Sequence, residues 1–194
     1  MKDMKISFSD ESEELLETGG GIKKAEALLI GGEAFLVHNV DILSNLDLKE
    51  FYDFHLKSAM ENEAANGEEN VPELVATLLV SGRRTSRYLL FDRNDFLVGW
   101  TNEDTGELRS PYKNLEYPSS GIKKYAFGGV HVMSASIFKY MESFPEAFPI
   151  MDFYLAICHK CRIKAYVKDN LRLIDVGKLD SLERAEAFLR QNQQ

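Results

Sequence analysis

The sequence lacks any apolar run approaching the roughly 20 residues that a helix needs to span a bilayer. Its opening residues, MKDMKISFSDESEE, are polar and do not have the pattern of a signal peptide. Cysteine is scarce too: Cys158 and Cys161 are too few for a disulfide scaffold and are typical of a reducing compartment. We therefore expect a cytoplasmic protein without a membrane partner.

Positive charge is also in short supply, with 23 lysines and arginines against 31 aspartates and glutamates and a net charge of −8. Proteins that bind duplex nucleic acid usually present a clustered basic face, so no nucleic-acid partner is expected. Apolar residues, in contrast, make up 44% of the 194 residues. This content is enough for a sizeable core and predicts a single domain over residues 1–194.

Short strand-like runs alternate along the chain with stretches of helical spacing. This alternation predicts a layered α/β fold. The strands are expected at 5–11, 35–41, 74–81, in two pieces within 87–102, at 124–134, 161–170 and 171–176. The helices are expected at 22–30, 46–60, 136–144, 151–161 and 181–191.

Two aspartates each follow an apolar run, Asp41 in FLVHNVD and Asp175 in LRLIDVGK. Open α/β sheets hold their ligands at the carboxyl ends of strands, so these two carboxylates could share a divalent cation. An aspartate at a strand end is also a common turn former or helix cap, which is the alternative for each residue taken singly.

Glycines mark two further places. Gly19, Gly20 and Gly21 precede the predicted helix 22–30, where a turn without side chains could cradle an anion. They could equally form only a tight connection. Gly128 and Gly129 interrupt a strand, which indicates either a close approach to a ligand or a bulge.

Two stretches are predicted to be loops. Residues 61–70, ENEAANGEEN, are acidic and poor in large apolar side chains, and indicate a mobile surface loop. Residues 101–125 form the longest irregular stretch, and loops of this length are often lids or binding loops.

Taken in order, these motifs resemble the sugar-1-phosphate nucleotidyltransferases, close to the mannose-1-phosphate guanylyltransferase and muramate-phosphate uridylyltransferase branches. The resemblance rests on KISFSDESEELLETGGGIKKA, FLVHNVDILSNLDL, TLLVSGRRTSRYLLFD, YAFGGVHVMS, IMDFYLA and LIDVGKLDSLERAEAFL, and covers nearly the whole chain. It implies a Rossmann-like mixed sheet flanked by helices. It also implies transfer of a nucleoside monophosphate from a nucleoside triphosphate to a sugar-1-phosphate, with release of pyrophosphate.

The resemblance assigns roles to particular residues. Asp41 and Asp175 match the catalytic aspartates that hold Mg²⁺. The positions that match nucleotide contacts are Gly19, Gly20, Gly21, Thr18 and Asn39. Those assigned to the sugar are Gly129 and Asn102. The family's Glu-Lys pair is replaced here by GWTN, so Lys113, Lys123 or Lys124 would have to reach the sugar phosphate.

The family's opening strand and its G-x-G-T-R loop have no counterpart in this sequence. We therefore expect a chain that is N-terminally truncated relative to the family, either incomplete as an enzyme or supplied with the lost part by a partner. The alternative function is a non-catalytic module that binds a sugar phosphate or nucleotide-sugar. An open sheet edge predicts self-association in either case.

Overall fold

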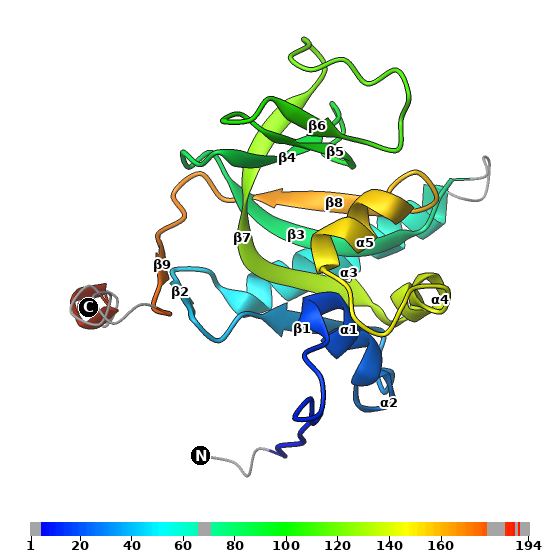
Figure 1. Cartoon of the computed structure of the whole chain (residues 1–194), viewed down its shortest axis with the longest axis vertical. Coiled ribbons are helices and arrows are strands. Elements are labelled where there is room, and N and C mark those ends of the chain that lie inside the picture. Colours follow the sequence, from blue (N-terminus) through cyan, green and yellow to red (C-terminus); the bar gives the residue numbers. More distant parts are fainter. Residues whose placement is uncertain (1–4, 66–70, 178–184, 189, 191–194) are drawn as a thin grey trace.

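The computed structural model describes residues 5–65, 71–177, 185–188 and 190. A mixed sheet forms the middle of the molecule and has helices on both faces (Figure 1). The helices are α1 (Glu17–Lys24), α2 (Glu26–Leu29), α3 (Leu48–Ala65), the 3₁₀ turn η1 (Ala135–Ile137), α4 (Phe138–Met141) and α5 (Ile150–Ile157). The strands are β1 (Ala34–His38), β2 (Ile42–Ser44), β3 (Leu74–Ser81), β4 (Arg87–Phe91), β5 (Leu97–Asn102), β6 (Glu107–Arg109), β7 (Lys123–Ser134), β8 (Arg162–Val167) and β9 (Leu173–Asp175).

The long strand β7 is central to the seven-stranded sheet, in which six strands follow the order β6-β5-β4-β7-β3-β8 and the seventh, β1, pairs with β7 off this path. β7 pairs antiparallel with β4 near its start and with β3 and β1 near its end. β3 and β8 form the parallel pair, and β2 and β9 form a separate two-stranded sheet. The predicted mixed sheet flanked by helices is therefore confirmed, with mostly antiparallel pairing.

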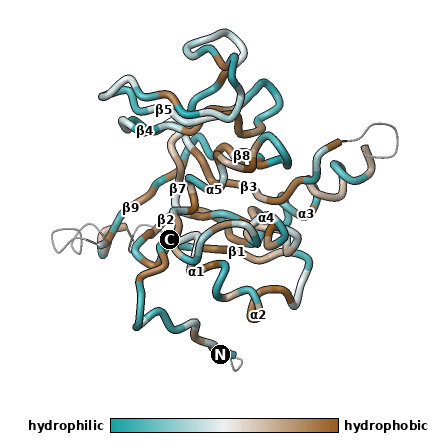
Figure 2. Tube along the Cα trace, turned by 45° about the vertical axis from the view of Figure 1, so that its right-hand side comes forward, coloured by the Kyte–Doolittle hydropathy of each residue, from teal (hydrophilic) through white to brown (hydrophobic). Residues whose placement is uncertain are grey.

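Two apolar clusters lie on opposite faces of the sheet because successive strand residues point to opposite sides. Leu78 and Met133 pack on one face with residues of α1, α4 and α5. Leu79 and Val132 pack on the other face with Phe51 of α3. Figure 2 shows hydrophobic residues along the central strands and mostly hydrophilic ones around the outer β4–β5 region. The result is a helix–sheet–helix arrangement.

Strongly patterned segments fold as predicted. β3 coincides with the predicted strand 74–81, β4 and β5 lie within 87–102, and α3 covers most of the predicted helix 46–60. The terminal helix predicted at 181–191 is seen at 185–188 and 190, while residues 181–184 lie outside the described ranges. No helix in the part of the chain that the structure describes is long and apolar enough to cross a membrane.

The predictions for residues 5–11 and 61–70 differ from the structure. Residues 5–11 alternate like a strand but have no regular structure, and Ile6 and Phe8 are 68% and 88% exposed. A strand needs a neighbouring strand to pair with, and the described residues provide none here. The loop predicted at 61–70 is helical up to Ala65, and residues 66–70 lie outside the described ranges.

Cys158 and Cys161 are buried free thiols at the end of α5. Each Sγ donates to a backbone carbonyl of the preceding helical turn. Burial raises the pKa of both thiols to about 12. Since the thiolate is the reactive form, these are inert core residues.

On each face of the sheet, one buried histidine forms hydrogen bonds between the sheet and the helix that covers it. The two ring nitrogens of His55 in α3 lie 2.8 Å from the Thr77 hydroxyl and 3.0 Å from the Ser134 hydroxyl. On the other face, Nδ1 of His131 lies 2.6 Å from the Tyr154 hydroxyl. Burial lowers the pKa of His55 to about 4 and that of His131 to about 3. Both side chains are therefore neutral in the folded protein at neutral pH.

These histidines make stability depend on pH. Their ordinary pKa in the unfolded chain is about 6.5, so their contribution is complete above that pH and is lost as pH falls towards 4 and 3. From pH 7 to pH 5 we expect the free energy of unfolding to fall by about 2 kcal/mol for each histidine. His131→Gln should remove about half of this dependence in urea unfolding followed over that range. The exposed control His159→Gln should keep all of it, and identical pH profiles for His131→Gln and wild type would contradict the account.

Candidate functional site

Two aspartates, one in a turn and one at a strand end, face one small space beside Gly177. Asp41 lies in the turn between β1 and β2, and Asp175 is the last residue of β9. β2 and β9 pair antiparallel, with Ile42 opposite Asp175. A Cβ built on Gly177 would lie 3.2 Å from a carboxylate oxygen of each aspartate. The fold therefore brings together two carboxylates that are far apart in the sequence.

Backbone hydrogen bonds set the relative position of the two aspartates. The amide of Val176 donates to the carbonyl of Asp41 at 2.7 Å. The amide of Gly177 donates to a carboxylate oxygen of Asp175 at 3.0 Å. The first bond joins the turn after β1 directly to the residue that follows β9, and the second fixes the Asp175 carboxylate beside Gly177.

Gly129 of β7 shapes the turn that carries Asp41. Its φ is +74°, and its carbonyl accepts a 3.2 Å hydrogen bond from the amide of Asn39. The carbonyl of Asn39 in turn accepts from the amide of Ile42 at 3.1 Å. A Cβ on Gly129 would lie 3.5 Å from the side-chain nitrogen of Asn39. Asn39 and Gly129, predicted to contact nucleotide and sugar, thus lie beside Asp41.

The donor set at Gly177 suits a hard cation. Carboxylate oxygens are the ligands that Mg²⁺ prefers, and Mg²⁺ is commonly held by one or two carboxylates together with substrate phosphates. Within residues 5–65, 71–177, 185–188 and 190, no group of three or more His, Cys, Asp or Glu side chains is placed to hold a metal. Asp41 and Asp175 therefore fit a magnesium ion that substrate completes, and this assignment stays a prediction.

The glycine triplet lies inside a helix, so the prediction of a turn ahead of the helix is wrong. Gly19, Gly20 and Gly21 belong to α1, which begins at Glu17. The amide of Gly19 donates to the carbonyl of Phe148 at 3.0 Å. A Cβ on Gly20 would lie 2.0 Å from the carbonyl oxygen of Glu146. The absence of side chains lets α1 pack directly on the backbone before α5.

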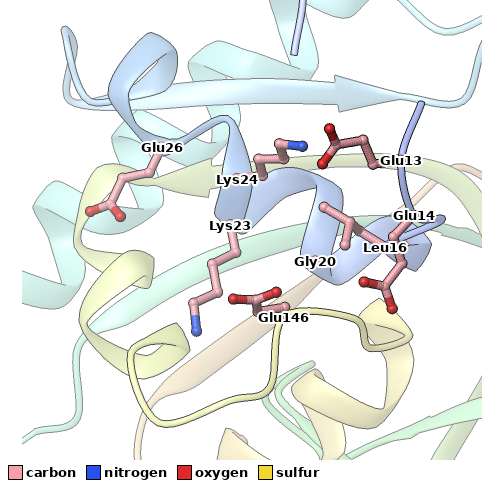
Figure 3. A pocket seen from close by; sticks show the side chains of 8 residues that line it. All are labelled: Glu13, Glu14, Leu16, Gly20, Lys23, Lys24, Glu26 and Glu146. Atoms are coloured by element: carbon pink, nitrogen blue, oxygen red, sulfur yellow. The ribbon is translucent and has the colours of Figure 1, made fainter. Parts of the chain in front are cut away.

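A pocket of about 630 Å³ opens along α1 (Figure 3). Glu14 and Glu146 contribute carboxylates to its wall, and Lys23 and Lys24 contribute ammonium groups. Nζ of Lys23 donates to the carbonyl of Phe144 at 2.6 Å, and Nζ of Lys24 donates to the backbone carbonyl of Asp10. Both lysines are thus held by backbone contacts. The exposed Thr18 precedes the glycines on the same helix, and its nucleotide contact stays a prediction.

The other predicted residues that lie on strands belong to β5 and to the start of the central strand β7. Asn102 ends β5, which β4 separates from β7, about 10 Å at the usual strand spacing. Its side-chain oxygen accepts from a backbone amide two residues further on. Lys123 forms a 2.8 Å ion pair with Asp95, and Lys124 pairs with Glu103. Neither lysine is free to meet a sugar phosphate without breaking these pairs.

Gly177 is a site residue that the sequence reasoning misses. Its signal is the order of residues after the strand: the carboxylate of Asp175, one residue, and then a glycine. The glycine keeps the space between the two carboxylates clear of side-chain atoms.

A mixed sheet between helical layers is the fold of the nucleotide-diphospho-sugar transferases, and solved structures of sugar-phosphate nucleotidyltransferases match the chain. An apo UDP-glucose pyrophosphorylase matches with a TM-score of 0.60 and 18% identity over 94% of this chain and 63% of its own. The inositol-1-phosphate CTP transferase from T. maritima gives 0.54 and 16% over 90% and 61%. A protein from Bacillus anthracis described as a glucose-1-phosphate thymidylyltransferase gives 0.58 and 15% over 89% and 60%.

This likeness concerns the fold, since the identities are low. The chain spans about three fifths of the length of these three proteins. No protein-family model matches the sequence, and no curated protein matches it.

The packing of α1 predicts that an alanine at Gly20 destabilises the protein. Gly20→Ala places a methyl group against the Glu146 carbonyl. Alanine favours a helix by about 1 kcal/mol over glycine, but overpacking costs about 1–3 kcal/mol and a 2.0 Å approach to backbone is at the severe end. We expect a net loss of stability of about 1–2 kcal/mol in urea unfolding. Gly31→Ala is the control, because no atom lies within 4 Å of its Cβ position. Equal stability of the two variants would refute the packing role.

Proposed function

We propose that the chain acts in the transfer of a nucleoside monophosphate from a nucleoside triphosphate to a sugar-1-phosphate. In this reaction an oxygen of the sugar-1-phosphate attacks the α-phosphorus. A new P–O bond forms as the bond to the leaving pyrophosphate breaks. The observation that supports the proposal is the meeting of Asp41 and Asp175 around Gly177, on a fold shared with proteins named for such transfers.

In this proposal the chain's residues position charged groups rather than form covalent bonds. Asp41 and Asp175 would hold Mg²⁺, which when bound neutralises phosphate charge. Asn39 would orient the nucleotide from the turn that the Gly129 carbonyl fixes. Gly129, which has no side chain, would leave space for the sugar. We also propose that the transferred nucleoside monophosphate is a guanylyl or a uridylyl group, as in the two branches that the motifs resemble.

A second candidate function is a non-catalytic module that binds a sugar phosphate or nucleotide-sugar. The engagement of Lys123 and Lys124 by carboxylates favours it, because transfer needs cations on the reacting phosphates. The two functions are distinguished by measuring whether the chain releases pyrophosphate when it is given a nucleoside triphosphate and a sugar-1-phosphate. Binding without release supports the module, and release supports the enzyme.

We also propose that the chain self-associates. β1 pairs with β7 along one edge, and within the described residues no strand pairs along its other edge. Open edges of this kind favour pairing with another chain. Sedimentation velocity should show a species heavier than 22.0 kDa that increases with protein concentration. A single monomer at every concentration would contradict this.

The aspartate pair predicts a metal-dependent binding site. Calorimetric titration of nucleotide-sugars and sugar-1-phosphates with Mg²⁺ should detect binding that Asp41→Asn and Asp175→Asn each weaken by more than about tenfold. The basis is that removal of a residue that only supports a metal ligand already costs about 10–100-fold. Asparagine keeps the shape of the side chain and removes its charge.

Two further variants serve as a charge control and as a steric test in the same titration. Asp169→Asn removes the same charge from an exposed turn and should bind as wild type does. Gly177→Ala should fold, because its φ lies outside the left-handed range, yet place a methyl group 3.2 Å from both carboxylates and weaken Mg²⁺-dependent binding. If the folded wild-type protein binds no member of the panel, or if Asp169→Asn is impaired as much as the site variants, the proposed function is wrong.

A further inference from the structure

A second, smaller pocket lies between α3 and β8, outside the candidate site. Its volume is about 180 Å³, and its lining includes Ser58 and Asn62 of α3, Phe96, and Arg162 and Lys164 of β8. β8 runs from this pocket towards the segment that ends in Asp175, and its six residues span about 17 Å. The pocket is thus at the opposite end of β8 from the paired aspartates.

Two cations share the pocket wall. Arg162 and Lys164 are two residues apart on one strand, so their side chains point to the same face of the sheet. Neither has a carboxylate partner among the residues that the structure describes. Glu61 lines the same pocket but pairs with Lys57, at 3.8 Å. Two like charges are therefore held side by side without a partner of opposite charge.

Neutral groups hold these cations in position. The guanidinium carbon of Arg162 lies 4.6 Å from the ring centre of Phe96, and Nζ of Lys164 lies 6.0 Å from it. An Nη of Arg162 donates to the side-chain oxygen of Asn62 at 2.7 Å, which leaves its other N–H groups available. Nζ of Lys164 lies 3.5 Å from the Ser58 hydroxyl. Ser58 and Asn62 are only 5% and 7% exposed, so the groups that contact the two cations are themselves buried.

We propose that this pocket binds a small phosphate-class oxyanion. A planar guanidinium beside an ammonium group is the combination that proteins use for phosphate oxygens. The volume selects the class of ligand, because nucleotide-sized molecules usually need about 300–1,000 Å³. The phosphate group comes either from free inorganic phosphate or from a small phosphomonoester, and it places negative charge between two cations that otherwise repel each other.

The test is an NMR chemical-shift titration of the full chain at constant ionic strength. One arm uses inorganic phosphate and the other uses glycerol 3-phosphate. Saturable shifts at residues of this pocket are expected in at least one arm, and the stronger arm identifies the source of the phosphate group. Lys164→Gln and Arg162→Gln should each raise the Kd by about tenfold, the loss expected for one charge-assisted hydrogen bond. Absence of saturable shifts in both arms overturns the proposal.

Two control variants and one stability measurement test whether the shifts report specific binding in this pocket. Lys49→Gln removes the same charge from an exposed site on α3 and should leave the titration unchanged. Asp41→Asn should also leave it unchanged, which separates this pocket from the proposed catalytic site. Phosphate should raise the Tm of wild type more than that of Lys164→Gln, whereas a purely structural lysine would lower the Tm equally with and without phosphate. An equal loss in both conditions, or an unaltered Kd in Lys164→Gln, overturns the proposal.

Discussion

The candidate site depends on the backbone conformation of β7 at Gly129. At a φ of +74°, an L-residue with a side chain would be strained by about 1–2 kcal/mol, and glycine avoids this cost. The register of the neighbouring β3 shifts between Leu78 and Val80 at the same level, so β7 bulges there. The Gly129 carbonyl meets the amide of Asn39, and the chain turns at Asp41 towards β2.

The second half of the site arrives from the far end of the sequence. β9 pairs with β2, and the amide of Val176 closes on the carbonyl of Asp41. The two carboxylates are thereby placed by main-chain hydrogen bonds at a glycine, which leaves their side chains facing one space. This arrangement needs no large conformational change to accept a cation, because the acidic groups are already adjacent. The phosphate-class pocket at the other end of β8 is built differently, from cations held on aromatic rings and α3.

Sequence reasoning succeeded where one physical signal dominated. β3 is apolar at nearly every position and α3 has clear helical spacing, so both were predicted closely. The run at 5–11 has an equally good alternation but no strand to pair with, and pairing cannot be read from a local pattern. The glycine triplet was misassigned because three glycines favour a turn, whereas here contact with Phe148 and Glu146 makes a side-chain-free helix face necessary. The ordered motifs single out Asp41 and Asp175, and the structure brings these two residues together, while their role stays a prediction. The sequence order after Asp175 contains Gly177, but only the folded backbone shows that this glycine lies between the two carboxylates.

The shared cation site is tested most directly by replacing Mg²⁺ with paramagnetic Mn²⁺ and following the loss of amide NMR signals in the full chain. If Asp41 and Asp175 hold one cation, the first signals to broaden are those of residues 39–42, 129 and 175–177, and Asp41→Asn abolishes this selective broadening. Broadening that begins elsewhere on the acidic surface, or that is the same in Asp41→Asn, would contradict the claim that Asp41 and Asp175 form one cation site.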